Sequence, residues 1–236
     1  GVGLIAAYVV HARRIERPLI DLGLLRLPTF RAGVLGGSVF RLGVGALPFL
    51  LPLQLQIGFG RTPLESGLTT FVAAVGAIAM KLTAGRILTR FGFRTTLAAN
   101  AVIAGAMLAV VALVGPATPV MLLMAILLVG GFFRSLEFTA INVVVFSEVD
   151  EARMSRATSF SSMMQQLSLS AGVALAALTL SGLGAASGQA AGPGDFAIAI
   201  AAVGGLSMLA AFVFLRLPAD AGAEMLESEP RATAEG

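Results

Sequence analysis

Long apolar stretches separated by short polar turns dominate the chain. The hydrocarbon core of a bilayer is about 30 Å thick, and a helix of about 20 apolar residues crosses it. The stretches long enough to cross are 31–57, 66–89, 96–115, 119–147, 157–183 and 194–216. Glycine, proline and serine mark the turns between them, most clearly at 58–63, 115–119 and 182–194. The pattern predicts an all-α membrane protein with six transmembrane helices.

The two ends of the chain differ from this pattern. Residues 1–12 begin inside an apolar run without the features of a signal peptide, so we expect the end of a preceding transmembrane helix in a fragment of a longer protein. Residues 13–30 are then a cytoplasmic connector, and 31–217 form the transmembrane bundle. Residues 218–236 are polar and acidic, which is typical of a disordered tail.

Arginines predict the orientation of the bundle. They gather in alternate connections and in the C-terminal tail, at positions 13, 14, 17, 26, 31, 90, 94, 153, 156, 216 and 231. The connections on the opposite side contain Arg61. Because basic residues favour cytoplasmic loops, we expect a multi-pass protein of the inner (plasma) membrane whose C-terminus is cytoplasmic.

Composition narrows the classes of function. The 236 residues are 57% apolar and 12% charged, whereas soluble domains are about 25% charged. The absence of cysteine excludes disulfides and thiolate chemistry, and His11 is expected at the membrane interface. The formal net charge of +3 is spread along apolar segments, which argues against nucleic acid. No catalytic motif is found, so we expect no enzyme, no cofactor and no metal.

Charged residues inside the apolar stretches are candidates for a transport pathway. Arg41, Lys81, Arg134 and Glu137 lie within predicted spans, and ionisable residues inside a membrane usually mark pathways or pairs. At 1.5 Å per residue they lie ~12–19 Å from the cytoplasmic ends of their helices. We therefore expect them in one layer near the middle of the membrane.

The spacing of Arg134 and Glu137 leaves two interpretations open. Residues at i and i+3 can form a structural ion pair. Alternatively, Glu137 is a protonatable carboxylate whose affinity for protons changes as a cavity opens or a cationic substrate arrives. Lys81 has a simpler explanation, because its long side chain can extend toward the interface.

A polar stripe follows one face of the predicted fifth span. Ser159, Ser162, Gln166 and Ser170 share this face, and Gln165 lies beside it. In a membrane such a face turns toward protein or water. Hydrogen bonding between helices and the lining of a substrate cavity both remain open as interpretations.

Glycine and proline predict a bend in the first span. Gly33, Gly36, Gly37, Gly43 and Gly45 precede Pro48 and Pro52 in this span. Small residues also let helices approach closely in lipid. Ordinary helix packing and a role in gating are both compatible with this composition.

The segment Gly85–Arg94 resembles the cytoplasmic loop motif of the major facilitator superfamily, G-x-L-a-D-r-x-G-r-k. Gly85, Arg90, Gly92 and Arg94 match the motif, whereas Thr89 stands at its acidic position. The interdomain charge pairing of that acid is therefore not expected here. We expect Gly92 to form a tight turn and the arginines to meet anionic headgroups.

Two further segments resemble the fourteen-span drug:proton antiporters of the EmrB/QacA type. They are Arg134–Asn142 and Met154–Leu175. Gln166, Leu167, Gly172 and Ala174 fit the family pattern, whereas Gln165 stands at an arginine and Ser168 at a glycine.

This resemblance implies that the chain is the C-terminal half of a major-facilitator transporter. Such a transporter exports hydrophobic or cationic compounds in exchange for protons by alternating access. The expected partners are the missing N-terminal half, the lipid bilayer, a small substrate and protons. Candidate pathway residues are Arg41, Lys81, Arg134, Glu137, Asn142, Ser162, Gln165 and Gln166. A symporter or uniporter for organic anions or sugars is the alternative, and a scaffold or intramembrane enzyme is disfavoured.

Overall fold

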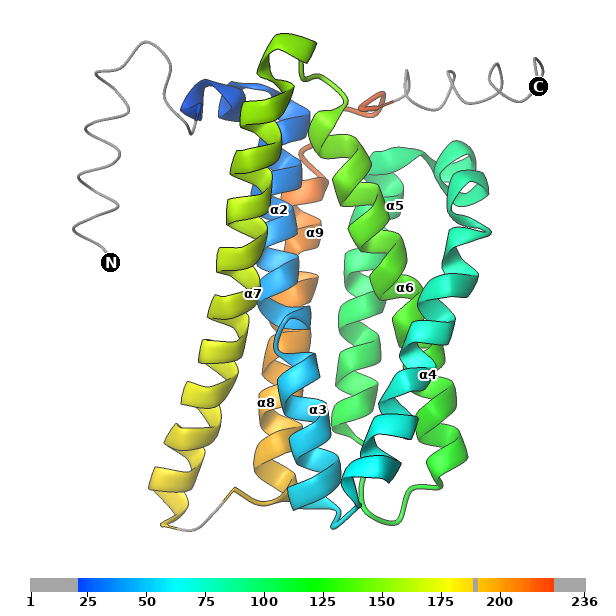
Figure 1. Ribbon diagram of the computed structural model, residues 1–236, viewed down its shortest axis with the longest axis vertical. Coiled ribbons are helices and arrows are strands. Elements are labelled where there is room, and N and C mark those ends of the chain that lie inside the picture. The colour runs from blue at the N-terminus through cyan, green and yellow to red at the C-terminus, as the bar shows by residue number, and fades with distance from the viewer. Residues whose placement is uncertain (1–20, 189–190, 223–236) are drawn as a thin grey trace.

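The computed structural model of the protein describes residues 21–188 and 191–222 (Figure 1). The predicted helix end at 1–12 lies outside the described residues, as do His11 and the connector up to residue 20. The tail from residue 223 onward lies outside them too. The division of the chain into a connector, a bundle and a tail therefore stays a prediction.

The described residues form helices joined by short connections. They comprise η1 (Leu22–Arg26), α2 (Pro28–Val44), α3 (Leu47–Leu53), η2 (Gln54–Gly58), α4 (Pro63–Lys81), α5 (Ala84–Ala112), α6 (Val120–Phe146), α7 (Glu151–Ser187), α8 (Pro193–Met208) and α9 (Ala210–Phe214). Grouped by continuity, they give six segments long and apolar enough to cross a membrane. The predicted fold class, a half-bundle of six transmembrane helices, is confirmed.

The first transmembrane segment is broken near its middle. α2 ends at Val44, a turn at Gly45 and Ala46 follows, and α3 begins at Leu47 with Pro48 in its first turn. Because proline lacks an N–H group, Pro48 leaves a carbonyl of the preceding turn without its helical partner. η2 then closes the segment as a π-helix. The predicted bend is confirmed.

The second and third transmembrane segments differ from the prediction. The sequence suggested one helix over 66–89, but α4 ends at Lys81 and a new helix starts at Ala84. α5 is itself kinked at Gly92, whose φ of 71° belongs to the left-handed region that favours glycine. Residues 84–91 therefore form a short helix that carries the chain from α4 to the body of α5. The apolar pattern continues through Leu82 and Thr83, which is why it did not reveal the break after Lys81. The tight turn expected at Gly92 is confirmed.

Two further boundaries need correction. α7 runs to Ser187, so the predicted turn at 182–194 begins only at Gly188, which adopts a φ of 65°. The last segment is also divided, since α8 ends at Met208 and α9 starts at Ala210. Alanine and serine continued the helix where the sequence analysis expected a loop.

Close glycine contacts join the helices in pairs. α4 packs mainly on α6, and α5 packs on α8 and α6. A Cβ atom at Gly76 would meet the carbonyl oxygen of Leu128, and one at Gly131 would meet that of Ala73. Such contacts bring two backbones together in lipid, where apolar burial gives little drive for association. The bundle therefore depends on these small residues for its packing.

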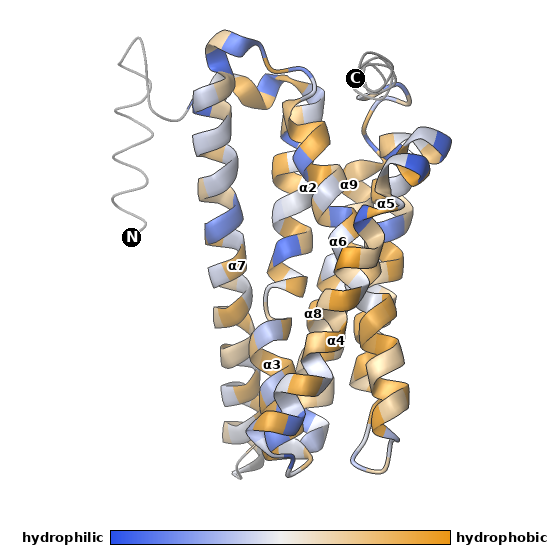
Figure 2. Ribbon diagram, turned by 45° about the vertical axis from the view of Figure 1, so that its right-hand side comes forward, coloured by the Kyte–Doolittle hydropathy of each residue, from blue (hydrophilic) through white to orange (hydrophobic). Residues whose placement is uncertain are grey.

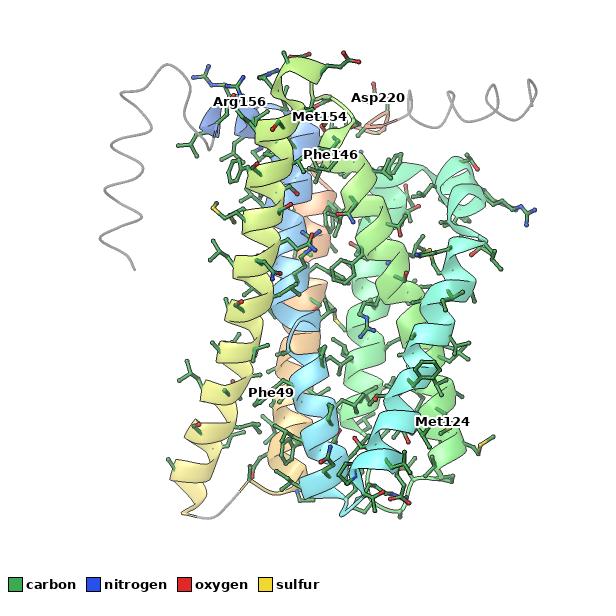
Figure 3. The ribbon with its side chains drawn as sticks, in the orientation of Figure 1. Phe49, Met124, Phe146, Met154, Arg156 and Asp220 are labelled. Carbon is green, nitrogen blue, oxygen red and sulfur yellow. The ribbon has the colours of Figure 1, made fainter. Side chains whose placement is uncertain are left out.

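Basic residues gather at one end of the bundle. Figure 2 shows hydrophilic colour concentrated at the upper end and apolar colour along α4, α5 and α6. Arg156 and Asp220 lie at this upper end in Figure 3, whereas Met124 lies toward the lower end. The chain's alternation between the ends places Arg61 in the lower connection between η2 and α4. The described part of the predicted arginine asymmetry thus corresponds to two ends of the molecule.

Candidate functional site

An open cavity of about 380 Å³ lies among α2, α3, α6 and α7. We call it the α2–α6–α7 cavity. The break between α2 and α3 forms one wall, because Gly45 and Pro48 both line it. The other walls come from α6 and α7. Its lining is Val44, Gly45, Pro48, Arg134, Phe138, Gln166, Leu169, Ser170 and Val173.

Arg134 is the charged residue of this cavity. It lies on α6, partly exposed, and no carboxylate lines the cavity beside it. The ion pair with Glu137 that the sequence allowed is not formed among the described residues. Glu137 instead faces α5. One helical turn of α6 therefore presents a cation toward the cavity and a carboxylate toward the bundle interior.

The polar stripe of α7 is exposed. Ser159, Ser162, Gln166 and Ser170 all remain accessible, and Gln166 and Ser170 line the α2–α6–α7 cavity. Within the described helices none of these side chains bonds to another helix, and Ser159 donates to the carbonyl of Ser155 on its own helix. This arrangement favours cavity lining over hydrogen bonding between helices. Gln165 is partly buried beside the stripe.

A buried polar cluster lies between α5 and α6. Glu137 is 0% exposed, and its Oε2 accepts a hydrogen bond of 2.8 Å from Nδ2 of Asn100. The same Nδ2 donates to the carbonyl oxygen of Phe133 at 2.8 Å. Oε1 of Glu137, Oδ1 of Asn100 and Oγ1 of Thr96 are buried without a hydrogen-bond partner in this structure. Burying polar atoms without hydrogen bonds destabilises the folded state. A proton or a water molecule that supplies a hydrogen bond here would therefore lower the free energy of the cluster.

Arg41 connects this cluster to the cavity side of the bundle. Its side chain is 1% exposed, and its guanidinium lies 5.4 Å from the centroid of the Phe138 ring. Nη2 donates a long bond of 3.5 Å to Oδ1 of Asn142, and Nε has no partner. No direct ion pair joins Arg41 to Glu137 among the described residues. Phe138 therefore separates the buried Arg41 from the open cavity that it lines.

The structure does not bring every candidate to this region. Lys81 is exposed at the last residue of α4. The prediction counted its depth along an uninterrupted helix that continued to residue 89. Because α4 ends at Lys81, that count does not apply. Ser162 and Asn142 are exposed, and neither lines the cavity. The charged residues that were predicted to share one layer therefore have different surroundings. Arg134 lines the cavity, Glu137 is buried between helices, and Lys81 is exposed.

Comparison with known proteins decides the family. The Major Facilitator Superfamily profile matches residues 33–234, which is most of the chain. The chain belongs to the Major Facilitator Superfamily.

Curated relatives within this superfamily carry the name "Putative multidrug resistance protein MdtD". The protein from Pectobacterium carotovorum is 34% identical over 225 residues, covering 93% of this chain and 48% of the relative. Those from Pectobacterium atrosepticum and Salmonella heidelberg are each 35% identical and cover 76% of this chain, with 39% and 38% of their own lengths matched. The chain thus spans about half or less of the length of these relatives. It is a multi-pass membrane segment of a transporter family.

The superfamily loop motif occupies the connection between α4 and the body of α5. Gly85 and Arg90 lie on the short helix 84–91, Gly92 makes the break with its positive φ, and Arg94 follows it. The hydroxyl of Thr89, at the motif's acidic position, donates to the carbonyls of Gly85 and Arg86 on its own helix. Thr89 therefore makes no charge pair at this position.

Sequence reasoning missed two members of the buried cluster. Thr96 and Asn100 are uncharged and lie outside the polar stripe of α7, so neither charge nor that stripe indicates them. Their spacing of four residues on one face of an otherwise apolar span was the available signal. Only the pairing of α5 with α6 shows that this face meets Glu137. Among the described residues, no group of His, Cys, Asp and Glu could hold a metal ion.

Proposed function

We propose that the chain is the C-terminal half of a secondary active transporter that exports hydrophobic or cationic compounds in exchange for protons. The N-terminal half of the same transporter is its partner. The two halves alternate between outward-open and inward-open arrangements around a shared substrate site. Superfamily membership and the names of the relatives support the transport of small molecules rather than their chemical conversion.

The α2–α6–α7 cavity is the observation that carries this proposal. It combines a broken helix, Arg134 and the polar face of α7 on one side of an otherwise apolar bundle. Irregular backbone and polar side chains are tolerated at membrane depth where they line a cavity or meet protein. The missing half covers this face, and the substrate binds between the halves.

The orientation follows from the arginines. The end that carries Arg94 and Arg156 lies on the cytoplasmic side of the inner membrane, because basic residues accumulate there. The connector and the C-terminal tail are on the same side. The bundle spans residues 31–217.

Different residues of the site bind the substrate and the proton. Gln166 and Ser170 contact the substrate from α7, and Arg134 contacts it from α6. Glu137 carries the proton, because it is the buried carboxylate of the cluster and its Oε1 is free to bind one. Arg41 lies on α2 and Glu137 on α6, so movement of α2 relative to α6 changes the distance between the two groups and with it proton binding.

Transport of organic anions is the second candidate. The observation that favours it is the position of Arg134, which lines the cavity while Glu137 does not. A cationic substrate requires carboxylates from the missing half to outweigh this charge. An anionic substrate pairs with Arg134 directly.

Transport assays on the complete protein in proteoliposomes separate the two candidates. An imposed pH gradient drives accumulation of ethidium, a lipophilic cation, or of carboxyfluorescein, an organic anion. We expect Glu137→Gln to abolish proton-driven accumulation of ethidium while ethidium binding persists. Loss of carboxyfluorescein transport in Arg134→Gln, with ethidium transport absent from the parent protein, selects the second candidate. Unchanged proton coupling in Glu137→Gln contradicts the role given to this carboxylate.

A further inference from the structure

A second hollow lies on the bundle away from the α2–α6–α7 cavity. It is a groove of about 400 Å³ between α5, α6 and the short helix 84–91, and we call it the α5–α6 groove. Its size falls within the range of small-molecule sites. The lining residues are Ile87, Phe91, Thr95, Thr96, Ala99, Asn100, Ile103, Phe133 and Leu136.

The surface that the α5–α6 groove presents is apolar. Thr96 and Asn100 contribute carbon atoms, because their polar atoms are turned inward to the buried cluster and its surroundings. Phe91 and Ile103 remain 55% and 39% exposed at the groove. A polar ligand would find no hydrogen-bonding group there, whereas a hydrocarbon chain would fit this lining.

Arginines stand at the mouth of the α5–α6 groove. The guanidinium of Arg90 lies 5.8 Å from the centroid of the Phe91 ring, which lines the groove. Arg86 is one helical turn from Arg90 on the same face, and Arg94 follows the break at Gly92. None of these arginines forms an ion pair within the described residues.

The helices that carry these arginines supply no exposed acidic residue beside them. The chain contains no aspartate or glutamate between Glu65 and Glu137, and Glu137 is itself fully buried. A cationic compound would therefore be repelled from the mouth of the groove. An amphiphile could place its hydrocarbon tail in the apolar groove and its anionic headgroup beside the arginines.

We propose that the α5–α6 groove binds an anionic phospholipid, with one acyl chain in the groove and the headgroup phosphate at Arg86, Arg90 and Arg94. The lipid covers apolar surface at a junction where α4 and α5 make few direct contacts. It thereby fixes the short helix 84–91 against α6. The groove is separate from the substrate cavity, although Thr96 and Asn100 also belong to the buried cluster of Glu137. Lipid binding is therefore tested by a measurement that does not depend on transport.

The absence of tryptophan from the chain permits a direct test. The complete protein, with any tryptophan outside this chain replaced by phenylalanine and Ile103→Trp introduced, is reconstituted in phosphatidylcholine vesicles. Phosphatidylglycerol or phosphatidylcholine with brominated acyl chains is added at equal mole fraction, and fluorescence quenching is measured. Since each arginine near the surface strengthens anionic-lipid binding by about fivefold, we expect the brominated phosphatidylglycerol to be preferred at least about fivefold. No preference overturns the proposal.

Charge variants then locate the preference. We expect the triple change Arg86→Gln, Arg90→Gln and Arg94→Gln to reduce the preference to about one, and the corresponding lysine changes to retain it. The matched control removes the same charge elsewhere at the same end through Arg26→Gln, Arg31→Gln and Arg216→Gln. If the control loses the preference equally, general surface potential explains it and the proposal is wrong.

Position variants test the groove itself. A reporter at Phe212→Trp, which is exposed on α9, is expected to show no preference between the two lipids. Ala99→Phe, which fills the groove, is expected to reduce quenching of the Ile103→Trp reporter. Quenching that is unaffected by this filling, or absent because protein covers the groove, contradicts lipid binding there.

Discussion

α7 and α5 are both long apolar helices, yet they have opposite surroundings. In the most apolar window of α5, 56% of the residues are buried, against 11% in α7. α5 lies between α6 and α8, and a Cβ atom at Gly204 of α8 would meet the backbone of Gly105 on α5. α7 packs chiefly on α2 and leaves its polar stripe uncovered within the described bundle. α5 thus serves the packing of the bundle, whereas most of the surface of α7 is left uncovered by the described helices.

The largest effect is expected where two backbones touch. Leucine at Gly204 would press against the carbonyl oxygen of Gly105 and Cβ of Leu108. Because backbone cannot move aside cheaply, we expect Gly204→Leu to destabilise the bundle by about 3 kcal/mol. Gly205→Leu is the control, since nothing lies within 4 Å of its Cβ position. Equal melting temperatures of the two variants in detergent would show that α5 and α8 are not held as described.

A smaller loss is expected from the buried cluster. Asn100→Leu removes the bonds to Glu137 and to the carbonyl of Phe133. Leaving these buried acceptors unpaired costs about 2 kcal/mol, which thermal or denaturant unfolding would detect. The matched change Gln166→Leu concerns an exposed amide on α7 that bonds to no other described helix. Its effect should stay within about 0.5 kcal/mol, and a loss equal to that of Asn100→Leu would refute the distinction.

The junction of α2 with the α6–α7 connection should contribute about 1 kcal/mol. Glu148 accepts hydrogen bonds from the N–H and hydroxyl of Thr29, the latter at 2.7 Å, at the start of α2. Thr29→Val removes the hydroxyl bond and keeps the other. Thr179→Val on exposed α7, where the hydroxyl bonds only within its helix, is the control. If unfolding measurements find both variants equally stable, the hydrogen bond between Thr29 and Glu148 does not stabilise the bundle.

The smallest effect on stability is expected on α7, where accessibility is the informative measurement. Ser162→Cys should change stability by no more than about 0.5 kcal/mol. This chain lacks cysteine, so within it only the introduced thiol reacts with a hydrophilic, membrane-impermeant reagent. We expect Ser162→Cys to react faster than Leu178→Cys, which is 71% exposed on the same helix but lies off the polar stripe. A faster reaction of Leu178→Cys would place the polar stripe away from water.

The local sequence predicted the helices of the bundle more completely than it predicted the residues of the candidate site. Apolar length predicted the transmembrane segments, and Pro48 with its neighbouring glycines predicted the broken first segment. The break after Lys81 escaped prediction because Leu82 and Thr83 do not interrupt the apolar pattern. Their spacing identified Arg134 and Glu137 as neighbours on one helix, α6. It could not show that they face different sides of the bundle, because a helical position does not identify the neighbouring helix.

The sequence by itself determined that hydrocarbon surrounds these helices, that basic residues mark one end, and that the chain resembles a major-facilitator half. These properties depend on length, composition and local spacing. Only the tertiary structure decided that Asn100 meets Glu137, that Arg134 lines a cavity and that an apolar groove lies beside Arg90. Each of these depends on which helices are neighbours and on how each helix is rotated about its axis. Close contacts between residues far apart in the chain, such as Gly204 with Gly105, fix both.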